Sequence, residues 1–221
     1  MSDALLAPIE SGDVHRLADL LAAGADPNTT MISHYYTLDV RLTPLQAAVR
    51  ELQPSGEREP GGAVDAIVLL LRHGAMVDGR DGSGDTTPLL MAVVMNHIEA
   101  VRILLAAGAD PNVRDDVGDA PLRICADKGY LEMARLLLVC GATKTIDEWG
   151  GDRPMTALGL AARGLHVEMV KLLLAHGADP QRKNVDDLTP LDCLEFVDSP
   201  DDPTAQDRLQ EIRRLLGDPS A

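Results

Sequence analysis

A nine-residue phrase, Leu-Leu-Ala-Ala-Gly-Ala-Asp-Pro-Asn, fills residues 20–28 and returns unchanged at residues 104–112. A close copy ends in Gln at residues 173–181, and two weaker copies begin at Leu70 and Leu137. The glycines of the five copies lie at positions 24, 74, 108, 141 and 177, so they are 50, 34, 33 and 36 residues apart. Self-similarity at a near-constant interval predicts an array of stacked units rather than one globule around a central core.

Each unit is predicted to hold two antiparallel helices and a finger, by which we mean the outward loop that leads to the next unit. Thr-Pro-Leu begins at Thr43, Thr87 and Thr189. Thr can cap a helix, and Pro at the first helical position loses no hydrogen bond, so this tripeptide predicts the start of a first helix. The repeated glycine follows the second helix, where a left-handed turn favours glycine.

These signals predict one domain of six units, at about 1–28, 29–78, 79–112, 113–145, 146–181 and 182–217, with a frayed tail at 218–221. Asp3 is expected to cap the first helix, and the end units are expected to have polar outer faces. The second unit carries ten extra residues near 53–62, between its helices. The first finger carries seven extra residues, among them His34, Tyr35 and Tyr36.

The period near 33 residues, with Thr-Pro-Leu and Gly-Ala-Asp in register, resembles the ankyrin repeat from about residue 3 to residue 216. Two units depart from the pattern, with Ala120-Pro-Leu and Thr156-Ala-Leu, which predicts weaker caps there. The resemblance implies an all-α fold, an ankyrin-repeat solenoid of about six helix-turn-helix units. It also implies a concave groove, lined by fingers and first helices, that binds proteins and carries no catalysis of its own.

The chain has 35 acidic and 20 basic residues, a formal net charge of −15. Such a charge repels phosphate backbones, so nucleic acid is not an expected partner. It favours a protein partner of basic or mixed charge, although acidic residues also simply keep proteins soluble.

The N-terminal segment lacks the basic residues of a secretion signal, and no apolar run has the length of a membrane span. Cys125, Cys140 and Cys193 are an odd number at unrelated spacings, which favours reduced, buried thiols and a cytoplasmic location. A protein delivered into another cell by a dedicated secretion machine would have the same features.

No cofactor and no metal are expected. The histidines lie at turns or beside the repeated glycine, without a second ligand at zinc spacing. Residues 78–85 are similar to a calcium loop, but the twelfth residue from Asp78 is Leu89 and that from Asp81 is Ala92, where such a loop needs Glu. No phosphate-binding or catalytic motif is present, so an enzyme is not expected.

Matching the variable binding positions of ankyrin repeats to this chain implies a set of partner-contacting residues. Exposed aromatic residues are added because the chain contains only one Trp, three Tyr and one Phe, and aromatic side chains dominate binding hot spots. The predicted set is Tyr35, Tyr36, Arg50, Val94, Asp116, Val117, Asp119, Asp127, Trp149 and Arg163. The alternative for the aromatic residues is that they fold back to cover a neighbour.

The leading hypothesis is a non-enzymatic module, expected to be a monomer, that holds a partner protein in a concave acidic surface. Alternatives within the same class are a toxin-neutralising immunity protein, an inhibitor, or a secreted effector. The opposing class, an enzyme regulator with a small-molecule site between fingers, is disfavoured because the chain shows no concentrated set of polar catalytic groups.

Overall fold

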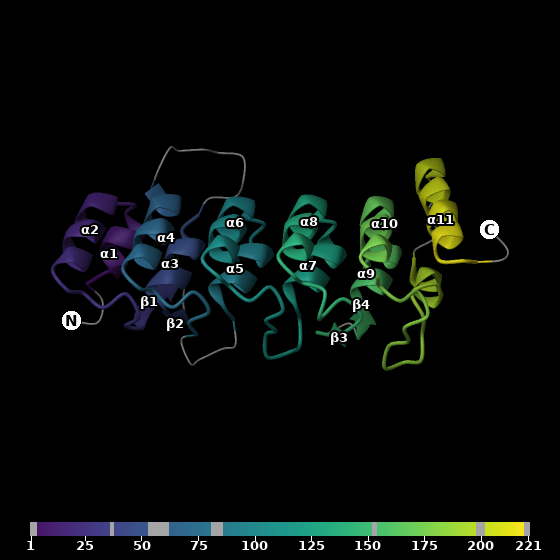
Figure 1. Cartoon of the computed structure of the whole chain (residues 1–221), viewed down its shortest axis with the longest axis horizontal. Helices are drawn as coiled ribbons and strands as arrows, with labels where there is room; N and C mark the ends of the chain where they lie inside the picture. Colours follow the sequence, from purple (N-terminus) through teal and green to yellow (C-terminus); the bar gives the residue numbers. More distant parts are fainter. Residues whose placement is uncertain are drawn as a thin grey trace. The chain divides into compact units, whose positions relative to one another are not determined.

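The structure, a computed structural model, describes residues 4–35, 38–52, 62–80, 86–151, 154–197 and 202–218. The chain divides into two compact units, residues 1–110 and 111–221. Within the described residues, each unit contains three helical pairs, which run in Figure 1 from purple to blue in the first unit and from teal to yellow in the second.

The first unit is built from three α-helical pairs. The bounds are α1 (Leu6–Glu10), α2 (Val14–Ala22), α3 (Pro44–Arg50), α4 (Gly62–Arg72), α5 (Pro88–Val94) and α6 (Ile98–Ala106). First helices contact first helices, α1 with α3 and α3 with α5, and second helices contact in the order α2, α4, α6. Leu45, Leu70 and Leu89 are fully buried in these contacts. Burying one face of each thin pair against its neighbours is what stabilises a repeat array.

The second unit has the same plan but ends differently. Its helices are α7 (Pro121–Lys128), α8 (Leu131–Val139), α9 (Ala157–Arg163), α10 (Val167–Ala175), the 3₁₀ helix η1 (Asp192–Phe196) and α11 (Pro203–Leu215). The α-helix expected after Thr189 is therefore replaced by a short 3₁₀ helix. Thr189 and Asp192 still form a reciprocal cap, because the Thr189 N–H donates to Asp192 Oδ2 at 2.7 Å and the Asp192 N–H donates to Thr189 Oγ1 at 3.3 Å.

The predicted helix starts at Thr43, Thr87 and Thr156 are confirmed. Thr43 and Gln46 form a full capping box, and the hydroxyls of Thr87 and Thr156 each accept the N–H three residues later. Ala120 provides no side-chain cap, as its residue type predicts. Asp3 lies outside the described residues.

The repeated glycine turns the chain from each second helix into a finger. Gly24, Gly74, Gly108, Gly141 and Gly177 have φ of +94°, +88°, +94°, +97° and +89°. At the first of these turns the N–H of Ala25 donates to the carbonyl of Leu20 at 3.0 Å, the closing bond of a glycine-terminated helix. The predicted left-handed turns are confirmed at all five positions.

Side chains near the end of one repeat bond to the glycine turn of the next. In the first unit, Asn28 donates to the Gly74 carbonyl at 3.0 Å and accepts the Met76 N–H at 2.7 Å. In the second unit, Asn112 donates to the Gly141 carbonyl at 3.0 Å and accepts the Lys144 N–H at 3.2 Å. These bonds fix the base of each finger against its neighbour.

Two fingers contain small antiparallel hairpins that the sequence analysis did not predict. β1 (Met31–Tyr35) pairs with β2 (Leu38–Leu42) in the extended first finger, with Met31 opposite Leu42. β3 (Trp149–Gly150) pairs with β4 (Met155–Thr156). The helical fold is confirmed, with these strands confined to fingers. Of the second insertion, residues 53–61 lie outside the described part, and Gly62 begins α4.

The cysteines are free thiols, but they do not share one environment. Cys125 and Cys193 are buried, as predicted, and burial raises the pKa of both, to about 11 for Cys193. The expectation that Cys140 is buried is wrong. It follows the last residue of α8, at the point where the helix ends at a solvent-exposed turn.

One buried ion pair supports the fingers of the second unit. Arg123 on α7 contacts Asp119 with 2.5 Å between Nε and Oδ1, and its Nη1 donates to the Met155 carbonyl at 2.8 Å. The Arg123 side chain is 6% exposed. Arg123 therefore links its own finger to the last strand of the next one.

We expect Arg123→Ala to lower the free energy of unfolding by about 3 kcal/mol, because it leaves a partly buried carboxylate and a carbonyl without their donor. The matched control is Arg114→Ala, which removes an exposed ion pair with Glu148 and should cost less than about 1 kcal/mol. Urea unfolding of both variants measures the difference. Equal losses would show that burial does not strengthen the Arg123 pair.

His97, at the start of α6, is a buried histidine that titrates abnormally. Its side chain is 5% exposed, and burial lowers the pKa, opposed by a hydrogen bond with the backbone of Leu52. Within the described residues, Nε2 has no hydrogen-bond partner. The folded protein therefore favours the neutral imidazole.

Because the unfolded histidine has the higher pKa, about 6.5, the unfolded chain binds more protons as the pH falls through that value, and stability decreases. We expect the wild type to lose more stability than His97→Gln between pH 7.5 and pH 5.5, measured by urea unfolding. The control variant is His15→Gln, which replaces an exposed histidine and should leave the contribution of His97 in place. A His97→Gln variant with the full wild-type pH dependence would contradict this origin.

Candidate functional site

The finger at residues 111–120 has a fixed tip that exposes two side chains. Asp115 Oδ1 accepts the N–H groups of Val117 at 3.2 Å and Asp119 at 2.7 Å, while the Asp115 N–H donates to the Asp119 carbonyl at 3.1 Å. Gly118, with φ of +89°, completes the turn. Asp116 is exposed and Val117 is 51% exposed. These hydrogen bonds fix the turn, in which the consecutive residues Asp116 and Val117, one acidic and one apolar, are both exposed.

Burial raises the pKa of Asp115 from its usual value, an effect opposed by the hydrogen bond from the Asp119 N–H and increased by the charge of Asp119. The Asp115 carboxylate is thus a structural acceptor inside the turn. Asp116, one residue later, is exposed.

The next finger packs directly onto this tip. The Gly151 N–H donates to the Val117 carbonyl at 2.7 Å. A Cβ atom added to Gly150 would lie 2.1 Å from the Gly118 carbonyl oxygen, so only glycine allows this approach. Trp149 precedes these glycines in β3 and is 46% exposed. The contact brings two exposed apolar residues, Val117 and Trp149, onto adjoining fingers.

We call Asp116, Val117 and Trp149 the finger surface. Its surroundings are mixed in charge, because Glu148 beside Trp149 forms an ion pair with Arg114 of the neighbouring finger. Asp119, also predicted to contact a partner, is paired with Arg123 and has a side chain that is only 25% exposed. Its carboxylate is therefore engaged in holding the finger.

Two predicted contact residues of this unit, Asp127 and Arg163, lie on the first helices α7 and α9, which contact each other. Asp127 is near the end of α7, 24% exposed, and forms an ion pair with Lys128 at 3.1 Å. Arg163 ends α9 and is half-buried near η1, where its charge opposes the rise that burial causes in the pKa of Cys193. Asp127 therefore has an ion-pair partner in the adjacent residue, and Arg163 lies close enough to Cys193 to influence its pKa.

In the first unit, Arg50 mainly anchors the β1–β2 hairpin. Its side chain is 15% exposed, and Nη2 lies 2.8 Å from the Ser33 hydroxyl, 2.9 Å from Glu51 Oε1 and 3.6 Å from Glu10 Oε1. Val94, at the end of α5, is 61% exposed and open to a partner.

Of the two predicted tyrosines, the structure describes only Tyr35, in the same hairpin. Tyr35 ends β1, opposite Leu38, and Tyr36 lies outside the described residues. Their part in binding stays a prediction.

Three large apolar residues of the second unit are exposed but were not among the predicted partner contacts: Val139, Val185 and Phe196. Val185 is 52% exposed on a finger that Asn184 closes as Asp115 does, accepting the N–H groups of Asp186 and Leu188. The sequence contained a signal for this equivalent finger, because Asp115 and Asn184 each lie six residues before the proline that follows the finger. Phe196, the one phenylalanine in the sequence, is 52% exposed at the end of η1.

The described residues contain no group of three or more His, Cys, Asp or Glu side chains placed to hold a metal ion. Among the described residues, no helix combines the length and apolar character needed to cross a membrane. In the fingers closed by Asp115 and Asn184, side-chain hydrogen bonds to the backbone fix the loop geometry.

The family model for ankyrin repeats, described as three copies, matches residues 5–115, 63–148 and 122–194. A crystal structure of an ankyrin repeat domain from Acinetobacter baumannii matches with a TM-score of 0.74, covering 98% of this chain and 97% of that one at 23% identity, which is a likeness of fold.

Two curated relatives show how much shorter this chain is than the proteins it matches. It is 36% identical over 52% of its length to alpha-latroinsectotoxin-Lt1a of Latrodectus tredecimguttatus, and 29% identical over 88% of its length to potassium channel AKT2/3 of Arabidopsis thaliana. The matches span 8% and 21% of those proteins. Ankyrin repeats generally bind proteins and are typically non-catalytic. With repeated Thr-Pro-Leu starts, left-handed glycine turns and family-model matches spanning residues 5–194, the chain belongs to the ankyrin repeat family.

Proposed function

We propose that this chain is a non-enzymatic recognition module that binds a partner protein of basic or mixed charge through its fingers and first helices. The observation that carries the proposal is the finger surface, where Val117 and Trp149 are exposed on fingers joined by the Gly151–Val117 hydrogen bond. We propose further partner contacts at Tyr35, Tyr36 and Val94 of the first unit and at Asp127 and Arg163 of the second.

The physical argument rests on preorganisation. An exposed indole and an isopropyl group lose hydration when a partner covers them, which gives the favourable term in association. The tip hydrogen bonds of Asp115 and the close contact of Gly118 with Gly150 already hold the backbone that carries them. A partner therefore does not have to order these fingers on binding, which lowers the entropic cost.

Charge defines the kind of partner. Asp116 is exposed beside Val117, and the chain as a whole carries a formal charge of −15. A basic patch that surrounds an apolar anchor complements this arrangement, and complementary charge raises the association rate more than it raises the affinity.

Trp149→Ala should weaken capture of the partner at least tenfold, because a central aromatic anchor accounts for about 2 kcal/mol or more of binding free energy. The measurement is affinity capture from the native cell followed by titration of the captured protein. The matched control is Val139→Ala on α8, which removes an apolar side chain that is 82% exposed in the same unit. Loss of the partner with Val139→Ala, but not with Trp149→Ala, would place the interface elsewhere.

Gly150→Ala tests position without deleting either anchor. The added Cβ would collide with the Gly118 carbonyl, so the two fingers must separate. We expect partner affinity to fall at least fivefold while the helical circular dichroism spectrum stays unchanged. An unchanged affinity would show that the juxtaposition of Val117 and Trp149 is not used.

Charge reversal tests the electrostatic part. Asp116→Lys should slow association with the captured partner several-fold at low salt, and the difference from wild type should shrink as ionic strength rises. Glu132→Lys, which reverses an exposed carboxylate on α8, is the control and should have a smaller effect. A partner whose association rate ignores both salt and Asp116→Lys would contradict a basic binding face.

A further inference from the structure

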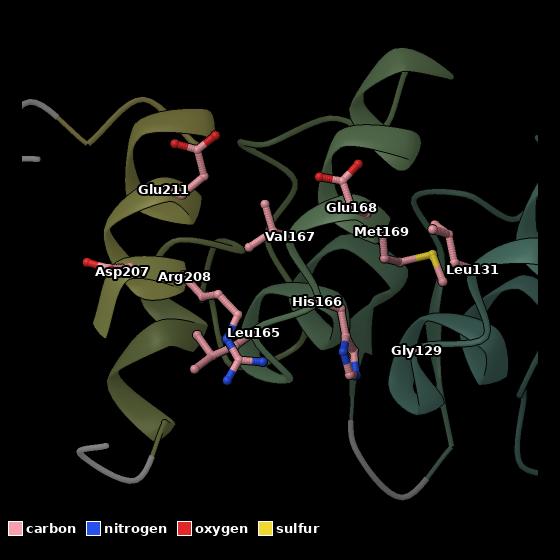
Figure 2. A pocket seen from close by; sticks show the side chains of 10 residues that line it. All are labelled: Gly129, Leu131, Leu165, His166, Val167, Glu168, Met169, Asp207, Arg208 and Glu211. Carbon is pink, nitrogen blue, oxygen red and sulfur yellow. The ribbon is translucent and has the colours of Figure 1, made fainter. Parts of the chain in front are cut away.

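A pocket of about 550 Å³ opens on the second unit among α8, α10 and α11, and contains no residue of the finger surface. Four of its lining residues are apolar: Leu131 at the start of α8, Leu165 before α10, and Val167 and Met169 in the first turn of α10. Figure 2 shows these side chains with α11 on the other side of the opening. A volume of this size accommodates a few side chains of a partner or a small ligand.

The histidine that lines the pocket is held between two glycines. A Cβ atom at Gly129 would lie 2.8 Å from His166 Cε1, and one at Gly164 would lie 2.6 Å from the same ring. Neither position tolerates a larger residue without moving His166. The imidazole lines the pocket and occupies space that a side chain at either glycine position would need (Figure 2).

Leu165 adopts a backbone conformation that leucine disfavours. Its φ is +53°, in the left-handed region, where the Cβ atom of an L-residue lies too close to the following carbonyl oxygen. The corresponding turns between first and second helices place Asn96 at φ +58° and Gly129 at φ +71°. Those residue types tolerate this conformation, so the leucine at 165 is not explained by the turn itself.

Strained residues persist where the surrounding structure or function requires their side chain, and they cluster at ligand-binding sites. Leu165 is one of the residues that line the pocket (Figure 2). The strain and the pocket are independent observations that involve the same residue.

The rim of the pocket has an excess of negative charge. Glu168, Asp207 and Glu211 line it, against one guanidinium from Arg208. Lys171, outside the lining, lies 3.1 Å from Glu168 and 3.4 Å from Glu211 and bridges α10 to α11. With Lys171 included, three carboxylates face two cations, which complements a ligand that carries positive charge.

We propose that this pocket is a second interaction site, which binds a partner segment that presents aliphatic side chains flanked by lysine or arginine. The aliphatic side chains enter among Leu131, Leu165 and Met169, and the flanking cations meet the carboxylates of the rim. Most of the lining residues come from the second helices α8, α10 and α11. None of them belongs to the finger surface.

The test is an NMR titration of the full chain with the peptide acetyl-Gly-Lys-Leu-Leu-Lys-Gly-amide. The methyl signals of Leu131, Leu165, Val167 and Met169 should shift and saturate. Peptides with Glu in place of Lys, and with Ser in place of Leu, should bind at least tenfold more weakly. A peptide with Ser in place of Lys should also bind more weakly, and equal binding would overturn the charge requirement.

Two variants separate a binding role from a folding role. Leu165→Asn should relieve the backbone strain, leave the Tm equal or higher, and weaken the peptide at least fivefold; Leu165→Ala should weaken binding equally. Val139→Ala should leave the Kd unchanged. The proposal fails if Leu165→Asn lowers the Tm, which would make Leu165 a packing residue, if it binds the peptide as the wild type does, or if the peptide shifts signals elsewhere instead.

Discussion

The fingers hold their positions because a polar side chain near the end of one repeat is bonded to the backbone of the glycine turn in the next. Asn28 does this for Gly74 and Met76, and Asn112 does it for Gly141 and Lys144. Asp147 also accepts the Asp179 N–H at 2.8 Å. Without these bonds each finger would be a surface loop free to move, because loops bury too little apolar surface to order themselves.

The same bonds explain why the repeated phrase is longer than a helix cap requires. Glycine alone ends the second helix, and its left-handed conformation needs no further signal. Asp-Pro-Asn ends the two identical copies, at residues 20–28 and 104–112. Its Asn supplies the donor and acceptor that reach the next repeat. Local capping and contact between repeats are thus encoded in one stretch of nine residues.

Helix pairs could be predicted from sequence because their signals act within a few residues. The capping box of Thr43 and Gln46 and the turn at Gly24 depend on neighbours in the chain. The β1–β2 hairpin also left a signal, since Leu38, Val40 and Leu42 alternate with Asp39 and Arg41, but the helical period of the array concealed it. The 3₁₀ helix at η1 followed the expected Thr-Pro-Leu and could not be distinguished from an α-helix by its cap.

The candidate site was only partly predictable. Trp149 and Val117 are exposed, as expected from the sequence, because their fingers contain too few apolar residues to cover them. Arg50 and Asp119 were predicted to face a partner, yet both mainly bind other parts of the chain, Arg50 through Ser33 and Asp119 through Arg123. The Ser33 contact joins residues 17 positions apart and cannot be read from local pattern. Asp119 and Arg123 are four residues apart, but the burial that makes their pair strong depends on the next finger.

Leu165 takes the left-handed position that Gly129 takes in the preceding repeat, and a glycine stands directly before it, at 164. Gly164 has φ of −75°, so its backbone does not require glycine. The ring of His166 does, because it occupies the space of a Cβ atom there. The histidine thus explains the glycine at 164, whereas the left-handed position of the turn is occupied by Leu165, a residue that disfavours this conformation. Asparagine at 165 would remove most of that strain without disturbing His166, as Asn96 does beside His97.

A chain that keeps leucine at 165 retains about 1–2 kcal/mol of strain. The gain that offsets this strain must come from the leucine side chain, which lines the pocket among α8, α10 and α11.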